Sequence, residues 1–249
     1  MTSRRPSPSR AFTLVELLVV IGIIALLISI LMPALSAARA QANTIKCASN
    51  LKSIGQVAHM YAQDFKGKVP RNYEYGGQYQ DGHILWAEAF ARYLYKGFRD
   101  NTNGDVSAAR DRQLAPEFEK MEVYQCPVNP RDEMVLDYVS NGWPLTTAAQ
   151  ATGSEPALPI TKVKRATEIV YLVDASSTNI GEMPRDQFHY YDALRPSSLP
   201  MSNPTTINPN SRVLTDTRHR GAANILYLDG HVSSKPFRSI TEWDFHPRQ

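Results

Sequence analysis

The feature that most constrains this chain is an uncharged run of 19 residues, Leu17 to Leu35, directly preceded by Glu16. As an α-helix rising about 1.5 Å per residue, the run covers roughly 28 Å, close to the ~30 Å hydrocarbon core of a bilayer. A carboxylate costs ~2.5 to 3.5 kcal/mol at the centre of a bilayer, so Glu16 is a functional candidate that needs a partner. A cut between Ala11 and Phe12 would supply one, because the new α-amine would lie at the positive end of the helix, where a carboxylate is favoured.

Residues 10 to 16 read R-A-F-T-L-V-E. They resemble the signal of type IV pilins and type II secretion pseudopilins, which has a short basic leader, a small residue before the cut, and Phe directly after it. The resemblance implies that a prepilin peptidase cleaves between Ala11 and Phe12 and methylates the new N-terminal Phe12. It also implies that Glu16 is the charge used in assembly and that Pro33 bends the helix. Ala11 departs from the Gly that is more usual before the cut.

Two other interpretations of the apolar run stay open. An ordinary secretory signal has an apolar region of about 7 to 15 residues and a small-x-small cleavage site, and Ala38-Arg39-Ala40 offers such a site. The longer run and the Glu in front of it count against that interpretation. A plain uncleaved membrane anchor is the second alternative.

The charge balance indicates the topology of the chain. The formal net charge is +3, and Arg4, Arg5 and Arg10 of the leader account for it, since without them 24 basic residues face 24 acidic ones. By the positive-inside rule, the leader stays in the cytoplasm and everything after Leu35 is exported. We therefore expect a single-pass protein of the cell (inner) membrane, either free or associated with a filament. A neutral mature chain gives no support to nucleic-acid binding.

The pattern after the apolar run predicts one long helix, from Phe12 to about Phe65, that Gly67 and Pro70 end. Its second half carries an apolar stripe at helical spacing. The stripe consists of Cys47, Leu51, Ile54, Ala58, Tyr61 and Phe65. Such a stripe indicates that this half of the helix covers a sheet.

The remainder of the chain predicts strands, loops and one short helix. We expect the short helix at 84–95, strands at 122–126, 168–174, 224–228 and 231–234, and loops at 71–83, 141–160 and 195–211. The predicted fold is α+β, a pilin-like lollipop in which a long N-terminal helix packs on an antiparallel β-sheet. The predicted divisions are a cytoplasmic leader (1–11), a transmembrane and filament-core helix (12–35), an amphipathic stem (36–66) and an exported globular domain (67–249).

The two cysteines lie on the exported side, where disulfides persist. Cys47 is on the apolar stripe, and Cys126 ends a predicted strand that Pro127 stops. A sheet packed on the helix could bring the two sulfurs together, so either a disulfide or two buried thiols fits the pattern. No CxxC spacing is present, which does not favour a zinc site made of thiolates.

The C-terminal segment HRGAANILYLDGH carries a second resemblance. His219 and Asp229 are separated by nine residues and Gly230 follows, as in the H-X9-DG motif that ends a large bacterial family of pilin-like proteins with the same kind of N-terminal signal. Asp-Gly between apolar runs predicts a two-residue hairpin turn of type I′. A structural role for Asp229 and Gly230 is therefore favoured.

Metal sites receive less support. His219, Asp229 and His231, with the more distant His189, are acceptable ligand types, although strand-turn spacing does not require them to converge. The stretch DNTNGD at 100–105 contains oxygen donors for Ca²⁺ but lacks the EF-hand register, so a solvated turn is favoured. We expect no resident metal and no cofactor.

The function predicted from the sequence is that of a structural pilin-like subunit, a pseudopilin, and not of an enzyme. No nucleophile elbow, phosphate loop or dinucleotide fingerprint is present. The expected partners are the membrane, a prepilin peptidase and other subunits of a type II secretion pseudopilus (a protein secretion apparatus) or a type IV pilus-like filament. The main alternative is a membrane-tethered protein that binds a ligand or metal outside the cytoplasm, and a tethered hydrolase is a third.

Overall fold

The structure is a computed structural model that describes the chain in separate stretches. They are residues 12–70, 86–98, 116–128, 136–141, 160–174, 193–194, 219–240 and 244. Ala11, His189, the 100–105 stretch and the predicted loops at 71–83 and 195–211 lie outside these residues, as does all but the ends of the predicted loop at 141–160. The chain divides into two compact units, Met1–Ala42 and Asn43–Gln249.

The predicted long helix is present as α1, Leu14–Asp64. It ends as the sequence predicts, because Lys66 and Gly67 adopt positive φ angles of 56° and 79°. The Gly67 amide then donates to the Ala62 carbonyl at 2.7 Å, which satisfies one of the last carbonyls of the helix. Pro33 lies inside α1, which continues through it, and the bend expected there stays a prediction.

The first unit presents an apolar surface that no other described residue covers. Its large hydrophobic side chains from Phe12 to Leu35 are between 46% and 77% exposed. Among the described residues, α1 is the one helix that is long and apolar enough to cross a membrane. A helix that is apolar on every side is stable only when lipid or protein surrounds it.

The second half of α1 buries the predicted stripe. Cys47, Leu51, Ile54 and Ala58 are buried. The stripe ends earlier than predicted, because Phe65 is 48% exposed and stacks on Tyr61 with ring centroids 4.1 Å apart.

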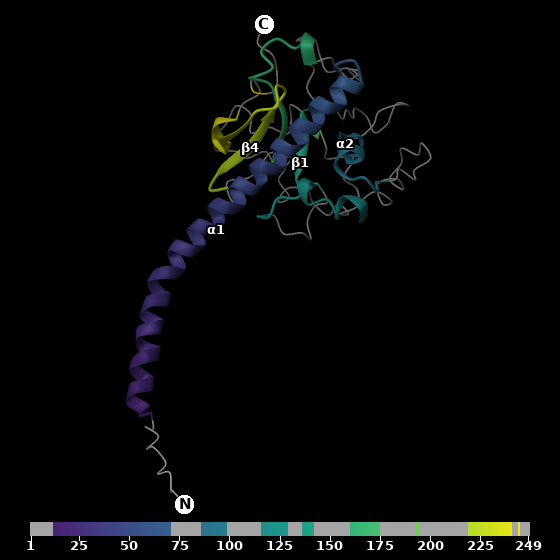
Figure 1. The fold of residues 1–249 in the computed structure, drawn as a ribbon. Coiled ribbons are helices and arrows are strands. Elements are labelled where there is room, and N and C mark those ends of the chain that lie inside the picture. The colour runs from purple at the N-terminus through teal and green to yellow at the C-terminus, as the bar shows by residue number, and fades with distance from the viewer. Residues whose placement is uncertain are drawn as a thin grey trace, which may run out of the picture. The chain divides into compact units, whose positions relative to one another are not determined.

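The short helix α2, Trp86–Leu94, forms where the sequence predicts it. Trp86 and Phe90 are fully buried and meet in an edge-to-face contact with centroids 6.2 Å apart. Tyr124 packs against Trp86 at 5.4 Å, and its hydroxyl donates to the Ala87 carbonyl at 2.6 Å. These aromatic rings belong to the core cluster that also includes α1 residues. The helix α2 lies beside the C-terminal part of α1 (Figure 1), where Phe90 contacts Tyr61.

The sheet contains β1 (Tyr138–Asn141), β2 (Val170–Asp174), β3 (Ala193–Leu194), β4 (Ala222–Tyr227) and β5 (Val232–Pro236). Their order is β3-β1-β2-β4-β5. Four of them form an antiparallel sheet, in which β2, β4 and β5 lie at predicted strands. The sequence predicts neither β1, whose Asn141 falls in the predicted loop at 141–160, nor the two-residue β3, which pairs with β1 in parallel. The α+β class is therefore confirmed.

Both faces of the sheet are covered by core side chains. Successive side chains of a strand point to opposite faces, and neighbouring residues of β2 and β4 belong to two different clusters. Leu172 and Leu226 belong to the core cluster that includes the α1 and α2 residues. Their neighbours Val173 and Ile225 belong to a second cluster with Phe237 and Ile240. The central strands β2 and β4 therefore read as nearly continuous apolar runs.

One predicted strand is wrong. The segment 122–126 contains a 3₁₀ turn, η1 (Glu122–Tyr124), instead. Asn50 of α1 explains the turn in part, because its amide donates to the carbonyls of Glu122 at 3.1 Å and Gln125 at 2.9 Å. Those carbonyls thus have hydrogen-bond partners without pairing to a strand, so the segment satisfies them outside the sheet.

Candidate functional site

The N-terminus of α1 forms a reciprocal hydrogen-bonded cap. Glu16 Oε2 accepts hydrogen bonds from the Thr13 amide at 2.9 Å and from the Thr13 hydroxyl at 2.7 Å. The Glu16 amide in turn donates to Thr13 Oγ1 at 3.3 Å. This is a capping box, in which two residues three apart satisfy amides that the first helical turn leaves free.

The role of Thr13 as a helix cap is not among the features predicted from the sequence. Thr13-Leu14-Val15-Glu16 fits the S/T-x-x-E pattern that marks a helix start before an apolar run, and that signal was available. Within the described residues, Glu16 bonds to its own helix. Phe12, the expected N-terminal residue after cleavage, is 74% exposed and directly precedes the cap.

At the other end of the chain, the H-X9-DG residues bracket β4. The β4–β5 hairpin forms as expected, but the turn is not type I′, because Gly230 has φ +84° and Asp229 has no positive φ. The Gly230 amide donates to the Tyr227 carbonyl at 2.9 Å, and the Tyr227 amide donates to the His231 carbonyl at 3.0 Å. A longer loop that closes with one left-handed glycine is the next most common hairpin connection.

The hairpin turn packs closely on α1. Lys52 Nζ donates to the Gly230 carbonyl at 2.9 Å. A Cβ at Gly230 would lie 2.6 Å from His59 Nε2, and a Cβ at Gly55 would lie 2.7 Å from Leu226 Cδ1. The glycines at both positions therefore allow the helix and the hairpin to approach each other.

Asp229 and His231 pair with each other in this turn. Asp229 Oδ1 accepts from the His231 amide at 3.0 Å and lies 2.6 Å from His231 Nδ1. The His231 ring also stacks on Tyr227 with centroids 4.2 Å apart. Asp229 and His231 are thus occupied within the hairpin, and the structure brings His219 to different partners.

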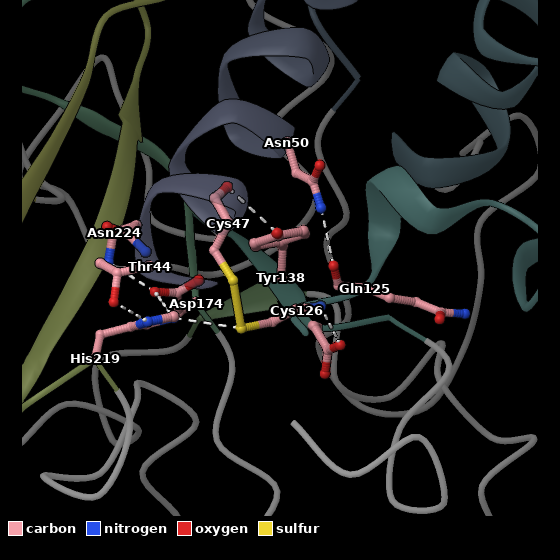
Figure 2. A network of polar contacts seen from close by, with 10 residues as sticks. Thr44, Cys47, Asn50, Gln125, Cys126, Tyr138, Asp174, His219 and Asn224 are labelled. Carbon is pink, nitrogen blue, oxygen red and sulfur yellow. Dashed lines mark hydrogen bonds and ion pairs between the residues drawn. A yellow bond between two sulfur atoms is a disulfide. The ribbon is translucent and has the colours of Figure 1, made fainter. Parts of the chain in front are cut away.

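His219 lies in a buried cluster with both cysteines. Cys47 and Cys126 form a disulfide with their Cα atoms 5.3 Å apart. His219 Nε2 lies 3.3 Å from Cys126 Sγ, and Figure 2 shows the imidazole directed at the sulfurs. The described residues contain one group of three or more His, Cys, Asp or Glu side chains whose possible ligand atoms all lie within 4.8 Å of one another. It consists of Cys47, Cys126 and His219.

Two polar residues complete the surroundings of His219. Asp174, the last residue of β2, places Oδ2 3.5 Å from His219 Nε2, and both side chains are fully buried. Asp174 Oδ2 also accepts a hydrogen bond from the backbone amide of Asn224 at 2.7 Å. On the other side of the ring, His219 Nδ1 lies 3.2 Å from the hydroxyl oxygen of Thr44 on α1. Each nitrogen of the imidazole therefore has a polar neighbour (Figure 2).

The backbone at His219 is unusual. His219, Arg220 and Gly221 have successive φ angles of 44°, 59° and 81°. A left-handed conformation costs roughly 1 to 2 kcal/mol for a residue with a Cβ, so the surrounding contacts stabilise this turn. The turn directs the His219 side chain into the interior just before β4 begins.

The cluster does not form a nucleophilic triad. In such a triad the base contacts the nucleophile through one ring nitrogen and the orienting carboxylate through the other. Here Cys126 Sγ and Asp174 Oδ2 both face Nε2 of His219. The geometry is that of a ligand set or a buried structural network.

Comparison with protein families gives one match. Residues 6–32 match the family described as the prokaryotic N-terminal methylation motif. Comparison with curated proteins gives no match, and neither does comparison with solved structures.

The motif indicates the class of the protein. A prokaryotic N-terminal methylation motif is the signal that prepilin peptidases process, and it indicates a type IV pilin-like protein. The apolar helix and the signal fit a single-pass anchor in the inner membrane. The signal is typical of a structural subunit.

Proposed function

We propose that this protein is a structural subunit of a type II secretion pseudopilus or a type IV pilus-like filament. The observation that carries the proposal is the combination of the methylation motif at residues 6–32 with an apolar helical surface that no described residue covers. In the membrane, lipid would surround this surface. In a filament, the helices of neighbouring subunits would replace the lipid.

The proposed maturation begins with insertion of the chain with its basic leader in the cytoplasm. A prepilin peptidase cleaves between Ala11 and Phe12, and Phe12 is methylated on its new amine. The globular unit is exported, and subunits then associate through their apolar helices. Glu16 pairs with the Phe12 amine of an adjacent subunit, so that its charge enters the filament core compensated.

Intact-mass and N-terminal analysis of the protein from native membranes tests this maturation. We expect a mature chain that begins at N-methyl-Phe12, because R-A-F-T-L-V-E resembles signals that are cut directly before Phe. A terminus at Gln41 would show cleavage by an ordinary signal peptidase and would remove the filament mechanism. An intact leader would indicate a plain anchor.

A further inference from the structure

The strongest unassigned feature of the molecule is the buried cluster of Cys47, Cys126, His219 and Asp174. These side chains come from four separate segments, namely α1, the segment after η1, the end of β2 and the turn before β4. The relative exposure of the four residues is 0%, 2%, 7% and 0%. Two sulfurs, an imidazole and a carboxylate are the donor types that tetrahedral zinc takes in proteins.

We propose that, when the disulfide is reduced, these four side chains bind one zinc ion. Cys47 Sγ, Cys126 Sγ, His219 Nε2 and Asp174 Oδ2 would be its ligands. Zinc binding and the disulfide are then two alternative states of the same cysteines. This inference is independent of the filament role proposed above.

The distances match a tetrahedral zinc site along two edges. With Zn–S near 2.3 Å and Zn–N and Zn–O near 2.0 to 2.1 Å, a tetrahedron has edges of about 3.5 Å between sulfur and nitrogen and about 3.3 Å between nitrogen and oxygen. The corresponding distances are 3.3 Å between Cys126 Sγ and His219 Nε2 and 3.5 Å between His219 Nε2 and Asp174 Oδ2. The ligand atoms of Cys47, Cys126 and His219 lie within 4.8 Å of one another. On reduction, the two sulfurs have to separate to about 3.8 Å and the Asp174 carboxylate has to move toward them.

The second ring nitrogen of His219 is held as a zinc-binding histidine requires. A zinc ligand commonly donates its other N–H to a fixed polar group, which sets the tautomer and the orientation of the ring. Thr44 Oγ1, 3.2 Å from His219 Nδ1, supplies that acceptor and leaves the Nε2 lone pair for the metal. In the disulfide state Nε2 faces Cys126 Sγ and Asp174 Oδ2, and the Thr44 hydroxyl accommodates either tautomer because it both donates and accepts.

The charges of the buried ligands also favour a zinc ion at this site. A buried carboxylate and two buried thiolates are costly unless a cation compensates them, and Zn²⁺ would carry that charge. The Asn224 amide that donates to Asp174 Oδ2 at 2.7 Å fixes the carboxylate on the side of the imidazole. The site would join α1, the sheet and the segment at Cys126 before oxidation.

Conversion to the disulfide state needs an external disulfide as oxidant. The first thiolate of the chain attacks a sulfur of that disulfide and releases one external thiolate. The second thiolate then attacks the mixed disulfide and releases the other external thiolate together with Zn²⁺. Two electrons pass from Cys47 and Cys126 to the external disulfide, and no atom is gained or lost by the chain.

The test uses the full chain in detergent micelles. The protein is reduced with a phosphine, freed of reductant by anaerobic gel filtration, and titrated with Zn²⁺ against a chromophoric chelator. We expect one zinc per reduced chain and none for the oxidised chain. With Co²⁺ in place of Zn²⁺, we expect thiolate-to-cobalt charge transfer and the d–d absorption of a tetrahedral ion.

Variants separate this site from adventitious binding by thiols. His219→Ala should weaken zinc binding more than about 100-fold, and Thr44→Val, which removes only the hydroxyl, about 10-fold. The matched control is His231→Ala, because His231 is partly exposed and pairs with Asp229. That variant should bind as the unaltered chain does, and circular dichroism of every reduced variant checks the fold.

Three outcomes would overturn the proposal. The reduced chain could bind no more zinc than the oxidised one, or His219→Ala and Thr44→Val could both bind with unchanged affinity. A reduced chain that loses its helical signal and does not regain it with zinc would equally exclude a native site.

Discussion

At the scale of single residues, Glu16 has one role in the structure and a second one in the proposed filament. Its carboxylate caps α1 through Thr13, a role worth ~1 kcal/mol in typical helices. Pairing with a Phe12 amine would instead depend on the negative charge. The two roles call for different side-chain chemistry, so substitution can separate them.

Glu16→Gln separates the two roles because glutamine retains the cap but carries no charge. We expect Glu16→Gln to reduce filament assembly as strongly as Glu16→Ala does, with membrane insertion and processing largely intact. Thr13→Ala is the matched control, since it removes the cap and keeps the charge, and it should assemble better than either Glu16 variant. Measurement compares the sheared filament fraction with the membrane fraction. Normal assembly of Glu16→Gln would contradict the pairing with the amine.

At the scale of elements, the contact between the β4–β5 hairpin and α1 gives Gly230 a structural role. Gly230 combines a left-handed φ of 84° with a position where a Cβ would meet His59. At the other end of β4, His219 meets Thr44 of the same helix. Both ends of the motif therefore hold the strand against α1.

Gly230→Ala should lower the free energy of unfolding by about 1 to 3 kcal/mol, because it combines left-handed strain with overpacking. Urea denaturation in micelles measures the change. Adding His59→Ala should restore part of the loss by making room for the methyl group, while the strain stays. Gly97→Ala, at an exposed turn with no such φ, should change stability by less than about 0.5 kcal/mol. Equal effects at the two glycines would show that the approach to α1 is unimportant.

At the scale of the whole molecule, several tyrosines link the packing of the globular unit to pH. Burial, the hydrogen bond to Asp64 and the charge of Asp64 together raise the pKa of Tyr93 to about 12. The Tyr93 hydroxyl donates to Asp64 Oδ2 at 2.6 Å, which joins α2 to the end of α1. Burial also raises the pKa of Tyr124, well above its ordinary value. The folded state therefore prefers the neutral phenols.

Stability should fall at alkaline pH as a consequence. A tyrosine whose pKa is raised from about 10 on folding contributes its full stabilisation below pH ~10. For Tyr93, this contribution is lost as the pH rises through about 12. Tyr93→Phe should therefore be less stable than the unaltered chain at pH 7, by about 0.5 to 1.5 kcal/mol, and the difference should close above pH ~10. Urea midpoints from pH 7 to 12 measure it, with exposed Tyr95→Phe as the control. A difference that is constant with pH would exclude this linkage.

The sequence by itself determined the features that depend on neighbouring residues. The membrane-length helix, its methylation motif, its buried stripe, the short helix α2 and the β4–β5 hairpin all follow from periodicity, from a local motif or from turn residues. The capping box at Thr13 and Glu16 was equally local, although it was not predicted. The 3₁₀ turn at Glu122–Tyr124 was missed because Asn50, 72 residues earlier in the chain, satisfies the Glu122 carbonyl.

Only the tertiary structure decided the composition of the buried cluster. Cys47 and Cys126 are 79 residues apart in the chain, and Cys126 and His219 are 93 apart. No local pattern relates residues at such separations, because packing of the sheet against α1 determines which side chains meet. Packing also separated His219 from Asp229 and His231, the partners that the sequence offered, and placed it beside the two sulfurs and Asp174.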